Sequence, residues 1–117
     1  MAVVDPELVH QGVTGTTARV LLNIPADLEY FDGHFPGAPI VPGVVQVKWA
    51  MEHARRCFAL SGGCSALEVL KFQRVIRPGA QVTLALEYFE RTGKVHFSFE
   101  CEQGRLSSGR IVLSKSP

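Results

Sequence analysis

The stretch that decides the fold is YFDGHFPGAPIVPGV, which occupies residues 30–44 and stands directly before a long helical pattern. It holds three prolines, three glycines and one histidine, His34, in fifteen residues. Proline fixes φ and glycine reaches backbone angles that other residues avoid, so this composition predicts a rigid turn and not a generic linker. We therefore expect the chain to hold His34 in a defined turn just before a helix N-terminus.

A helix is predicted from about residue 43 to about residue 60. Apolar residues recur there at helical spacing, Pro42 and Gly43 suit its first positions, and Gly62 and Gly63 end the pattern. A helix N-terminus presents unpaired backbone N–H groups and a partial positive charge. A titratable imidazole beside such donors indicates acid–base chemistry on a carbonyl compound.

The remaining sequence predicts strands. Apolar and polar residues alternate after the helix, with turn signals such as Pro78-Gly79 between the runs, and one run rich in aliphatic residues precedes the helix. The helix carries apolar residues on more than half of its circumference between Val44 and Met51, which favours a helix wrapped by a curved sheet. Strands are expected at residues 17–24, 65–76, 81–89, 94–101 and 105–114.

These elements predict a single α+β domain over residues 1–117, with an antiparallel sheet of five or six strands wrapped around one central helix. Four aromatic residues are expected in its core and not in a ligand platform: Trp49, Phe72, Phe97 and Phe99.

Composition and charge exclude several classes of protein. A chain of 117 residues with 46% hydrophobic content is long and apolar enough for a small globular core. The net charge of +1 predicts no bulk attraction to nucleic acid or to a membrane surface. No apolar run is long enough to cross a bilayer, and residues 1–6 lack the features of a signal peptide. We therefore expect a soluble cytoplasmic protein.

The cysteines and histidines form no ligand pattern. Three widely spaced cysteines without a CxxC pair argue against a disulfide scaffold and against a zinc site. The histidines outside the turn have no ligand-like spacing either, so no metal is expected. The residues concerned are Cys57, Cys64, Cys101, His10, His53 and His96.

The segment GHFPGxPIxPGV at residues 33–44 closely resembles the signature of the hot-dog 3-hydroxyacyl-acyl-carrier-protein dehydratases of fatty-acid synthesis. KFxRxIxPG at residues 71–79 resembles the third-strand segment of the same family, and PGVVQVxWA at residues 42–50 is nearer to the small dehydratases of aryl-polyene-type clusters. The resemblance implies a hot-dog fold and a substrate carried by acyl carrier protein. It implies no metal, nucleotide or redox cofactor.

The resemblance also implies roles for individual residues. His34 matches the active-site histidine, which would take the α proton of the thioester as a neutral imidazole. Gly43 matches the glycine whose amide polarises the thioester carbonyl. The peptide between His34 and Phe35 is expected to be cis. Residues implied to contact the substrate are Phe35, Pro42 and Val44.

Lys48 departs from the family pattern. The family places Glu or Asp fourteen residues after the histidine as the proton donor, and this chain has Lys48 there. An ammonium with a reference pKa of about 10.4 is a reluctant donor unless burial lowers that value. Two other interpretations stay open: Lys48 reaches solvent or pairs with Glu52, or Glu52, one turn further on, replaces it as the acid.

Lys48 also leaves the class of protein open. The first interpretation is a dehydratase that forms trans-2-enoyl thioesters, in which Lys48 is a site residue. The alternative is a non-catalytic hot-dog subunit that binds acyl carrier protein or an acyl chain, or completes the pocket of an active paralogue. A thioesterase of the same fold is less consistent with the turn around His34.

The partners are predicted from the charges and from the resemblance. A basic rim near the pocket mouth would dock acidic acyl carrier protein and its phosphopantetheine phosphate, although the same cations are equally suited to be ordinary solvated charges. The residues concerned are Arg55, Arg56, Lys71, Arg74 and Arg77. Because related hot-dog domains build their site across a dimer interface, we expect a homodimer or a heterodimer with a paralogue.

Overall fold

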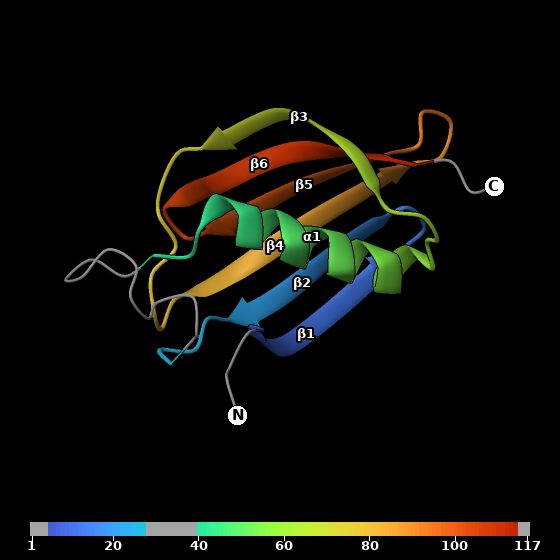
Figure 1. Ribbon diagram of the computed structural model, residues 1–117. Coiled ribbons are helices and arrows are strands. Elements are labelled where there is room, and N and C mark those ends of the chain that lie inside the picture. The colour runs from blue at the N-terminus through green and yellow to red at the C-terminus, as the bar shows by residue number, and fades with distance from the viewer. Residues whose placement is uncertain (1–4, 28–39, 115–117) are drawn as a thin grey trace.

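The computed structural model describes residues 5–27 and 40–114 of the chain. Six strands form one sheet in the order β1-β2-β4-β5-β6-β3, and every neighbouring pair is antiparallel. One helix joins the second strand to the third (Figure 1), which confirms the predicted α+β arrangement. The elements are β1 (Glu7–Thr14), β2 (Thr17–Asn23), α1 (Gly43–Phe58), β3 (Cys64–Phe72), β4 (Gln81–Phe89), β5 (Lys94–Cys101) and β6 (Gly104–Leu113).

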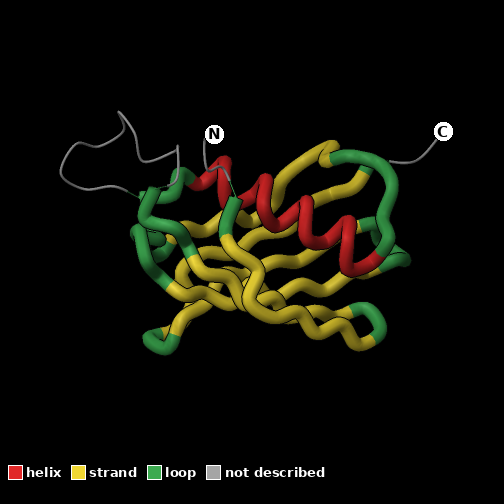
Figure 2. Tube along the Cα trace, turned by 90° about the horizontal axis from the view of Figure 1, so that it is seen from below, coloured by secondary structure: helices red, strands yellow, loops and turns green. Residues whose placement is uncertain are grey.

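The helix lies along the inner face of the curved sheet, and no second layer covers the outer face in the described part of the molecule (Figure 2). Its buried side carries Val45, Gln46, Trp49, Ala50, Met51, His53 and Ala54. One stripe stays open to solvent in the single chain, and it contains Val44, Lys48 and Arg55. The sheet therefore wraps most of the helix and leaves one side free.

Alternation along the central strands builds the core. Val82, Leu84 and Leu86 of β4 face inward, and so do Phe97 and Phe99 of β5. Because successive strand residues point to opposite faces, their polar neighbours line the outer face. Trp49, Phe97 and Phe99 are core residues, as predicted.

Phe72 is not a core residue, although the sequence predicted that it would be. Its side chain is 49% exposed in the single chain, because it stands at the end of the edge strand β3. The predicted strand over residues 65–76 also ends here. The N–H groups of Gln73 and Arg74 both donate to the carbonyl of Leu106, at 2.9 and 3.0 Å, and this turns the chain away from the sheet.

Strand β1 is absent from the sequence prediction. All eight of its residues are exposed, and a bulge between Leu8 and His10 interrupts its alternation. Gly12 also weakens the strand pattern. Strand β1 has no buried face of its own, so its pairing with β2 holds it in place.

A bulge sets the direction of the side chains in β3. Val69 has a φ of +51°, and the register with β6 shifts between Glu68 and Lys71. A bulge adds one residue to the strand. Leu67, Leu70 and Phe72 therefore lie on the same inner face, although Leu67 and Leu70 are three positions apart and would point to opposite faces of a regular strand. Leu70 then lies over Gly109 of β6, where an added Cβ would stand 2.5 Å from its Cδ2.

Truncation of the buried indole tests this core. We expect Trp49→Ala to lower the free energy of unfolding by about 3–5 kcal/mol, because it leaves a large cavity between helix and sheet. Arg56→Ala, on the exposed side of the same helix, should change it by less than about 0.5 kcal/mol. Urea unfolding followed by circular dichroism measures both, and equal midpoints would contradict the described packing.

Candidate active site

The candidate site begins where the chain enters α1. Val41 is buried, and its N–H donates to the carbonyl of Ile76 at 2.8 Å. Pro42 follows with φ −59° and ψ 148°, and its carbonyl accepts from the N–H groups of Val45 and Gln46 at 3.1 and 3.2 Å. These bonds fix the first turn of the helix to the loop that follows β3.

The N–H of Gly43 points out of the end of this helix. In a trans peptide the carbonyl and the N–H lie on opposite sides, and the carbonyl of Pro42 points into the helix. Within Pro42 and α1, no side chain caps the first turn and no acidic residue occupies it. The partial positive charge of the helix is therefore open to an electron-rich oxygen placed there.

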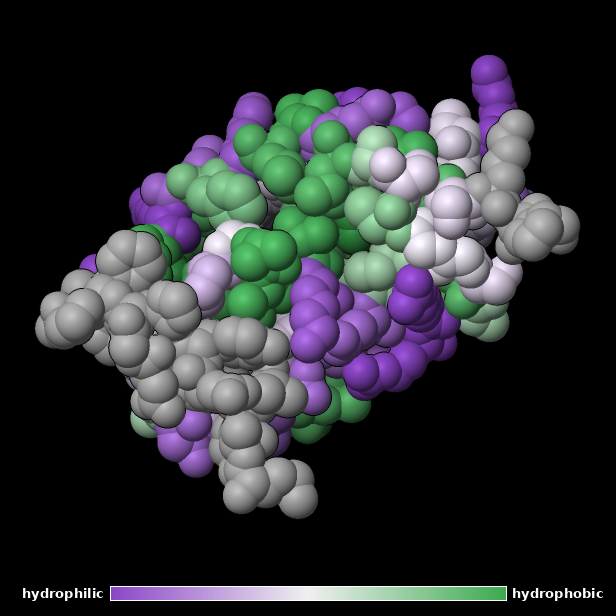
Figure 3. Space-filling view, in the orientation of Figure 1, coloured by the Kyte–Doolittle hydropathy of each residue, from purple (hydrophilic) through white to green (hydrophobic). Residues whose placement is uncertain are grey.

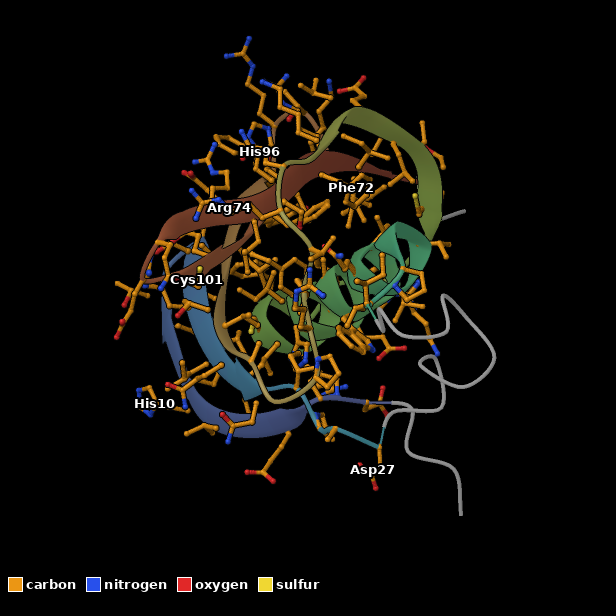
Figure 4. The ribbon with its side chains drawn as sticks, turned by 90° about the vertical axis from the view of Figure 1, so that its left-hand side faces the viewer. His10, Asp27, Phe72, Arg74, His96 and Cys101 are labelled. Carbon is orange, nitrogen blue, oxygen red and sulfur yellow. The ribbon has the colours of Figure 1, made fainter. Side chains whose placement is uncertain are left out.

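Phe72 explains why a glycine stands at position 43. A Cβ built on Gly43 would lie 2.7 Å from Cζ and 2.8 Å from Cε1 of the Phe72 ring. Figure 4, which looks at this end of the molecule, shows Phe72 on the inner side of the sheet. Any other residue at position 43 would push the aromatic ring away from the helix end.

Lys48 lies on the open stripe of α1, five residues beyond Gly43 and thus about 7.5 Å along the helix axis. Its Nζ stands 3.9 Å from Oε1 of Glu52, and the two side chains are 51% and 31% exposed. In the single chain Lys48 therefore forms an ion pair with Glu52, and its proposed role in the site stays a prediction. Val44, one turn earlier, is 78% exposed on the same stripe.

His34 and Phe35 lie outside the described residues, and so does the expected cis peptide between them. The structure thus places Pro42, Gly43, Val44 and Lys48 at one end and along one side of α1. It brings Phe72 and Gln46 to the same end.

The described histidines do not gather at this end of the helix. His53 is buried on α1, and burial lowers its pKa, with Arg56 adding to the effect and Asp5 opposing it. His96 lies on the outer face, where burial and then the neighbouring Arg110 lower its pKa (Figure 4). Among residues 5–27 and 40–114, no three His, Cys, Asp or Glu side chains form a group that could hold a metal ion.

The five cations of the expected basic rim fall into two groups. Lys71, Arg74 and Arg77 lie around the end of β3 and the loop that bonds to Val41, near the start of α1. Arg55 and Arg56 lie in the last turn of the helix, about 18–20 Å away along its axis. All five are exposed, but Lys71 lines a hollow on the outer face of the sheet, so in the single chain only Arg74 and Arg77 remain as candidates to border the site.

The sequence did not reveal Gln46 and Ser107. Gln46 Nε2 donates to the carbonyl of Val41 at 3.0 Å, and Ser107 Oγ donates to Gln46 Oε1 at 2.6 Å. Both residues are buried. The one signal in the sequence was a polar residue at a core-facing position of the helix, between Val45 and Trp49.

A large surface hollow lies away from this site. It measures about 590 Å³ and opens on the outer face of the sheet, where Ala85, Ser98 and Ser108 are among its lining residues. Its basic residues are Arg19, Lys71, Arg105 and Arg110. Since the helix covers the opposite face, this hollow is not continuous with the end of α1. Within the described ranges, no helix is long and apolar enough to cross a bilayer.

Similar curated proteins share one name. A 3-hydroxyacyl-[acyl-carrier-protein] dehydratase FabZ from Erythrobacter litoralis is 32% identical over 92 residues, which are 70% of this chain and 60% of the relative. One from Blochmanniella pennsylvanica is 34% identical over 94 residues, which are 71% of this chain and 62% of the relative. The matches thus span about three fifths of the length of these relatives.

Similar solved structures share the fold over nearly the whole chain. The dehydratase heterocomplex ApeI:P from Xenorhabdus doucetiae contains a chain that superposes with a TM-score of 0.90 at 30% identity, covering 96% of this chain and all of the other. An uncharacterized protein from Erwinia carotovora subsp. atroseptica gives 0.83 at 31% identity, covering 95% and 97%. The Escherichia coli PaaI protein gives 0.65 at 16% identity and shares the fold alone.

The fold is therefore the hot-dog fold that the sequence predicted. The family described as ApeI-like, ApeI dehydratase, matches residues 10–110, which include His34 and the whole of α1. The chain belongs to the ApeI-like dehydratase family.

Proposed function

We propose that the chain dehydrates a 3-hydroxyacyl thioester on acyl carrier protein to the trans-2-enoyl thioester, in fatty-acid or polyene biosynthesis. The observation that carries this proposal is the uncapped start of α1, where the N–H of Gly43 points outward in a chain of a dehydratase family. A developing enolate oxygen is the electron-rich atom that such a donor stabilises best.

The elimination requires two proton transfers. His34 takes the α proton, and the electron pair of that C–H bond forms the enolate, whose oxygen accepts the N–H of Gly43. The carbon–oxygen bond at C3 then breaks, the C2–C3 double bond forms, and the hydroxyl receives a proton and leaves as water. A single imidazole can accept the first proton, but the leaving hydroxyl needs an acid within reach.

Lys48 is the residue at the acid position, and we propose it as the proton donor. Its ammonium lies on the side of α1 that continues from Gly43 through Val44. Glu52 stands 3.9 Å from the ammonium and lies one turn further from the donor amide. The carboxylate would therefore orient the ammonium of Lys48 through this ion pair.

The second candidate function is a non-catalytic subunit that completes the pocket of an active paralogue. The exposure of Lys48 in the single chain favours it, since a catalytic acid is usually sequestered from solvent. The structure of ApeI:P is named a heterocomplex, and this is a statement about that protein. In this alternative the chain forms part of the pocket of the active paralogue and does not catalyse the reaction itself.

We propose that a second hot-dog chain, a copy or a paralogue, pairs with the edge strand β3. All but one of the nine residues of β3 are exposed, and its outer backbone edge has no neighbouring strand in the described chain. Figure 3 shows apolar surface gathered over β3 and the adjoining side of α1. The exposed apolar residues there include Val44, Leu67, Leu70 and Phe72. An exposed strand edge and an apolar surface of this kind mark an interaction site.

We also propose that Arg74 and Arg77 dock the acidic carrier protein, whereas Lys71 lies on the outer face of the sheet. Both arginines lie near the start of α1, where a thioester would have to enter, whereas Arg55 and Arg56 lie at the other helix end. Arg74 already donates to the carbonyl of Gln103 at 3.1 Å, so its position is fixed by the fold. Charges at such a rim raise the association rate of an oppositely charged partner.

The catalytic proposal is tested by measuring the hydration of a crotonyl thioester, which is monitored as a loss of the enoyl absorbance. We expect the wild type to be active and His34→Ala to be inactive. Lys48→Ala should lower kcat by about 10²–10⁴-fold, which is typical of a lost general acid, and Glu52→Gln should lower it by less than about tenfold.

Other outcomes identify the alternatives. Damage by Glu52→Gln with little effect of Lys48→Ala would make Glu52 the acid. An inactive wild type that Lys48→Glu activates would establish the non-catalytic subunit, because that change rebuilds a histidine–carboxylate pair.

The β3 interface is tested with two lysine substitutions of matched exposure. Leu67 on β3 and Val13 on the opposite edge strand β1 are 42% and 43% exposed. We expect a dimer by light scattering for the wild type and for Val13→Lys, and a monomer for Leu67→Lys, because a charge blocks pairing at the β3 edge. Dissociation by Val13→Lys alone would move the interface to β1.

The docking proposal is tested by charge reversal. Arg74→Glu combined with Arg77→Glu should raise KM for acyl carrier protein substrates by about tenfold or more, which corresponds to about 1.4 kcal/mol. The KM for acyl pantetheine, which lacks the acidic protein, should stay nearly constant. Arg56→Glu is the matched control, and an equal effect there would favour a rim that includes both ends of α1.

A further inference from the structure

Gln46 is a polar residue at a core-facing position in the first turn of α1. Its side chain is 3% exposed, and Ser107 of β6, which donates to it, is fully buried. Burying an amide or a hydroxyl is costly unless each is hydrogen-bonded. Here the costs are offset by two bonds, from Ser107 Oγ to Gln46 Oε1 at 2.6 Å and from Gln46 Nε2 to the carbonyl of Val41 at 3.0 Å.

Packing alone does not require an amide at this position. The neighbouring buried residues of the helix, Val45 and Trp49, fill the same interface with apolar side chains. An apolar residue of similar volume at position 46 would avoid the desolvation cost altogether. A buried, fully bonded polar pair instead specifies one geometry for the groups that it joins.

The group joined in this way is the backbone of Val41. Its N–H is held by the carbonyl of Ile76 at 2.8 Å, and its carbonyl is held by Gln46. The N–H of Val41 is therefore held by the loop after β3. Its carbonyl is held by Gln46, which is bonded in turn to Ser107 of β6. The orientation of the Val41–Pro42 peptide follows from these bonds.

Only one soft torsion separates that peptide from the donor amide of Gly43. The φ of Pro42, −59°, is held by the proline ring, which leaves ψ as the remaining freedom. The two bonds that the Pro42 carbonyl accepts from Val45 and Gln46 hold this ψ. The direction of the Gly43 N–H is thus transmitted from the Gln46 side chain through a chain of fixed groups.

We infer that Gln46, supported by Ser107, is a positioning residue that aims the Gly43 N–H at the thioester oxygen. This inference rests on the proposed function and adds the residue pair that makes the donor effective. An oxyanion donor acts only when it is aligned with the developing charge, and a displacement of about 1 Å can cost about 10²-fold in rate. The pair acts through Val41 and Pro42 and does not touch the substrate.

The test measures two properties of each variant, the stability of its fold and the polarisation of the carbonyl of a bound thioester. Gln46→Met combined with Ser107→Ala removes both buried side-chain polar groups at nearly constant volume, but it leaves the buried carbonyl of Val41 without its donor, so we expect a loss of stability of about 1–3 kcal/mol. The probe is a 2,4-hexadienoyl pantetheine thioester, whose absorbance shifts to longer wavelength when a hydrogen bond polarises its carbonyl. We expect the double variant to lose most of this shift and to lower kcat about 10–10²-fold, with KM nearly unchanged.

Two single variants separate positioning from general destabilisation. Ser107→Ala keeps the bond from Gln46 to Val41 but removes the support of Gln46, so it should lose less of the red shift than the double variant while it unfolds at lower urea. Met51→Ala, a buried change on the same helix that touches neither bond, should lower stability by about 2–5 kcal/mol and leave the red shift unchanged.

The results also separate this inference from the proposed function. A wild type that binds the probe with a red shift, together with a double variant that keeps both the shift and wild-type kcat, overturns the inference alone. A wild type that neither shifts the probe nor hydrates an enoyl thioester overturns the proposed function, and the positioning role with it. Loss of the red shift in Met51→Ala would also overturn the inference, because any damage to the core would then move the Gly43 N–H.

Discussion

Trp49, wholly buried on the central helix, holds α1 against the inner face of the sheet, and the candidate site depends on that contact. A helix of sixteen residues is marginal on its own, because helices in proteins gain most of their stability from burying an apolar face. The inward residues of β4 and β5 supply that face. Since the packed helix cannot slide, its N-terminus keeps one position relative to Phe72 and to the loop that bonds Val41.

The same N-terminus is built without the usual capping bond. A Ser, Thr, Asp or Asn at the cap position stabilises a helix by about 0.5–2 kcal/mol, and Pro42 offers no such side chain. Bonds to the carbonyls of Val41 and Pro42 hold this end of the helix, and among the described residues no side chain caps it. The buried pair of Gln46 and Ser107 thus stabilises the helix start in place of a capping side chain. This arrangement is consistent with the proposed use of the Gly43 N–H as a donor.

The sequence predicted the features that depend on local pattern. The helix, predicted over about residues 43–60 and found at Gly43–Phe58, and the strands of the central sheet follow from periodicity and turn residues, and the family motif predicts a site at the start of α1. It did not predict β1, whose exposed residues show no buried face. Nor did it predict the bond between Gln46 and Ser107, which are 61 positions apart and meet only because β6 crosses behind the helix start. Phe72 was misplaced because its exposure depends on β3 being an edge strand.

In the single chain, Lys48 lies on a surface that the proposed second chain would partly cover. Its ammonium and Glu52 remain partly exposed, on the stripe of α1 that continues to Val44 and faces the same side as the apolar residues of β3. A second chain on β3 would cover part of this stripe and remove water from it. Desolvation disfavours an ammonium and so makes it a better proton donor, while a nearby carboxylate opposes the change. The proposed role of Lys48 as proton donor therefore depends on whether the proposed second chain covers this stripe, which ties the chemistry proposed for this position to assembly.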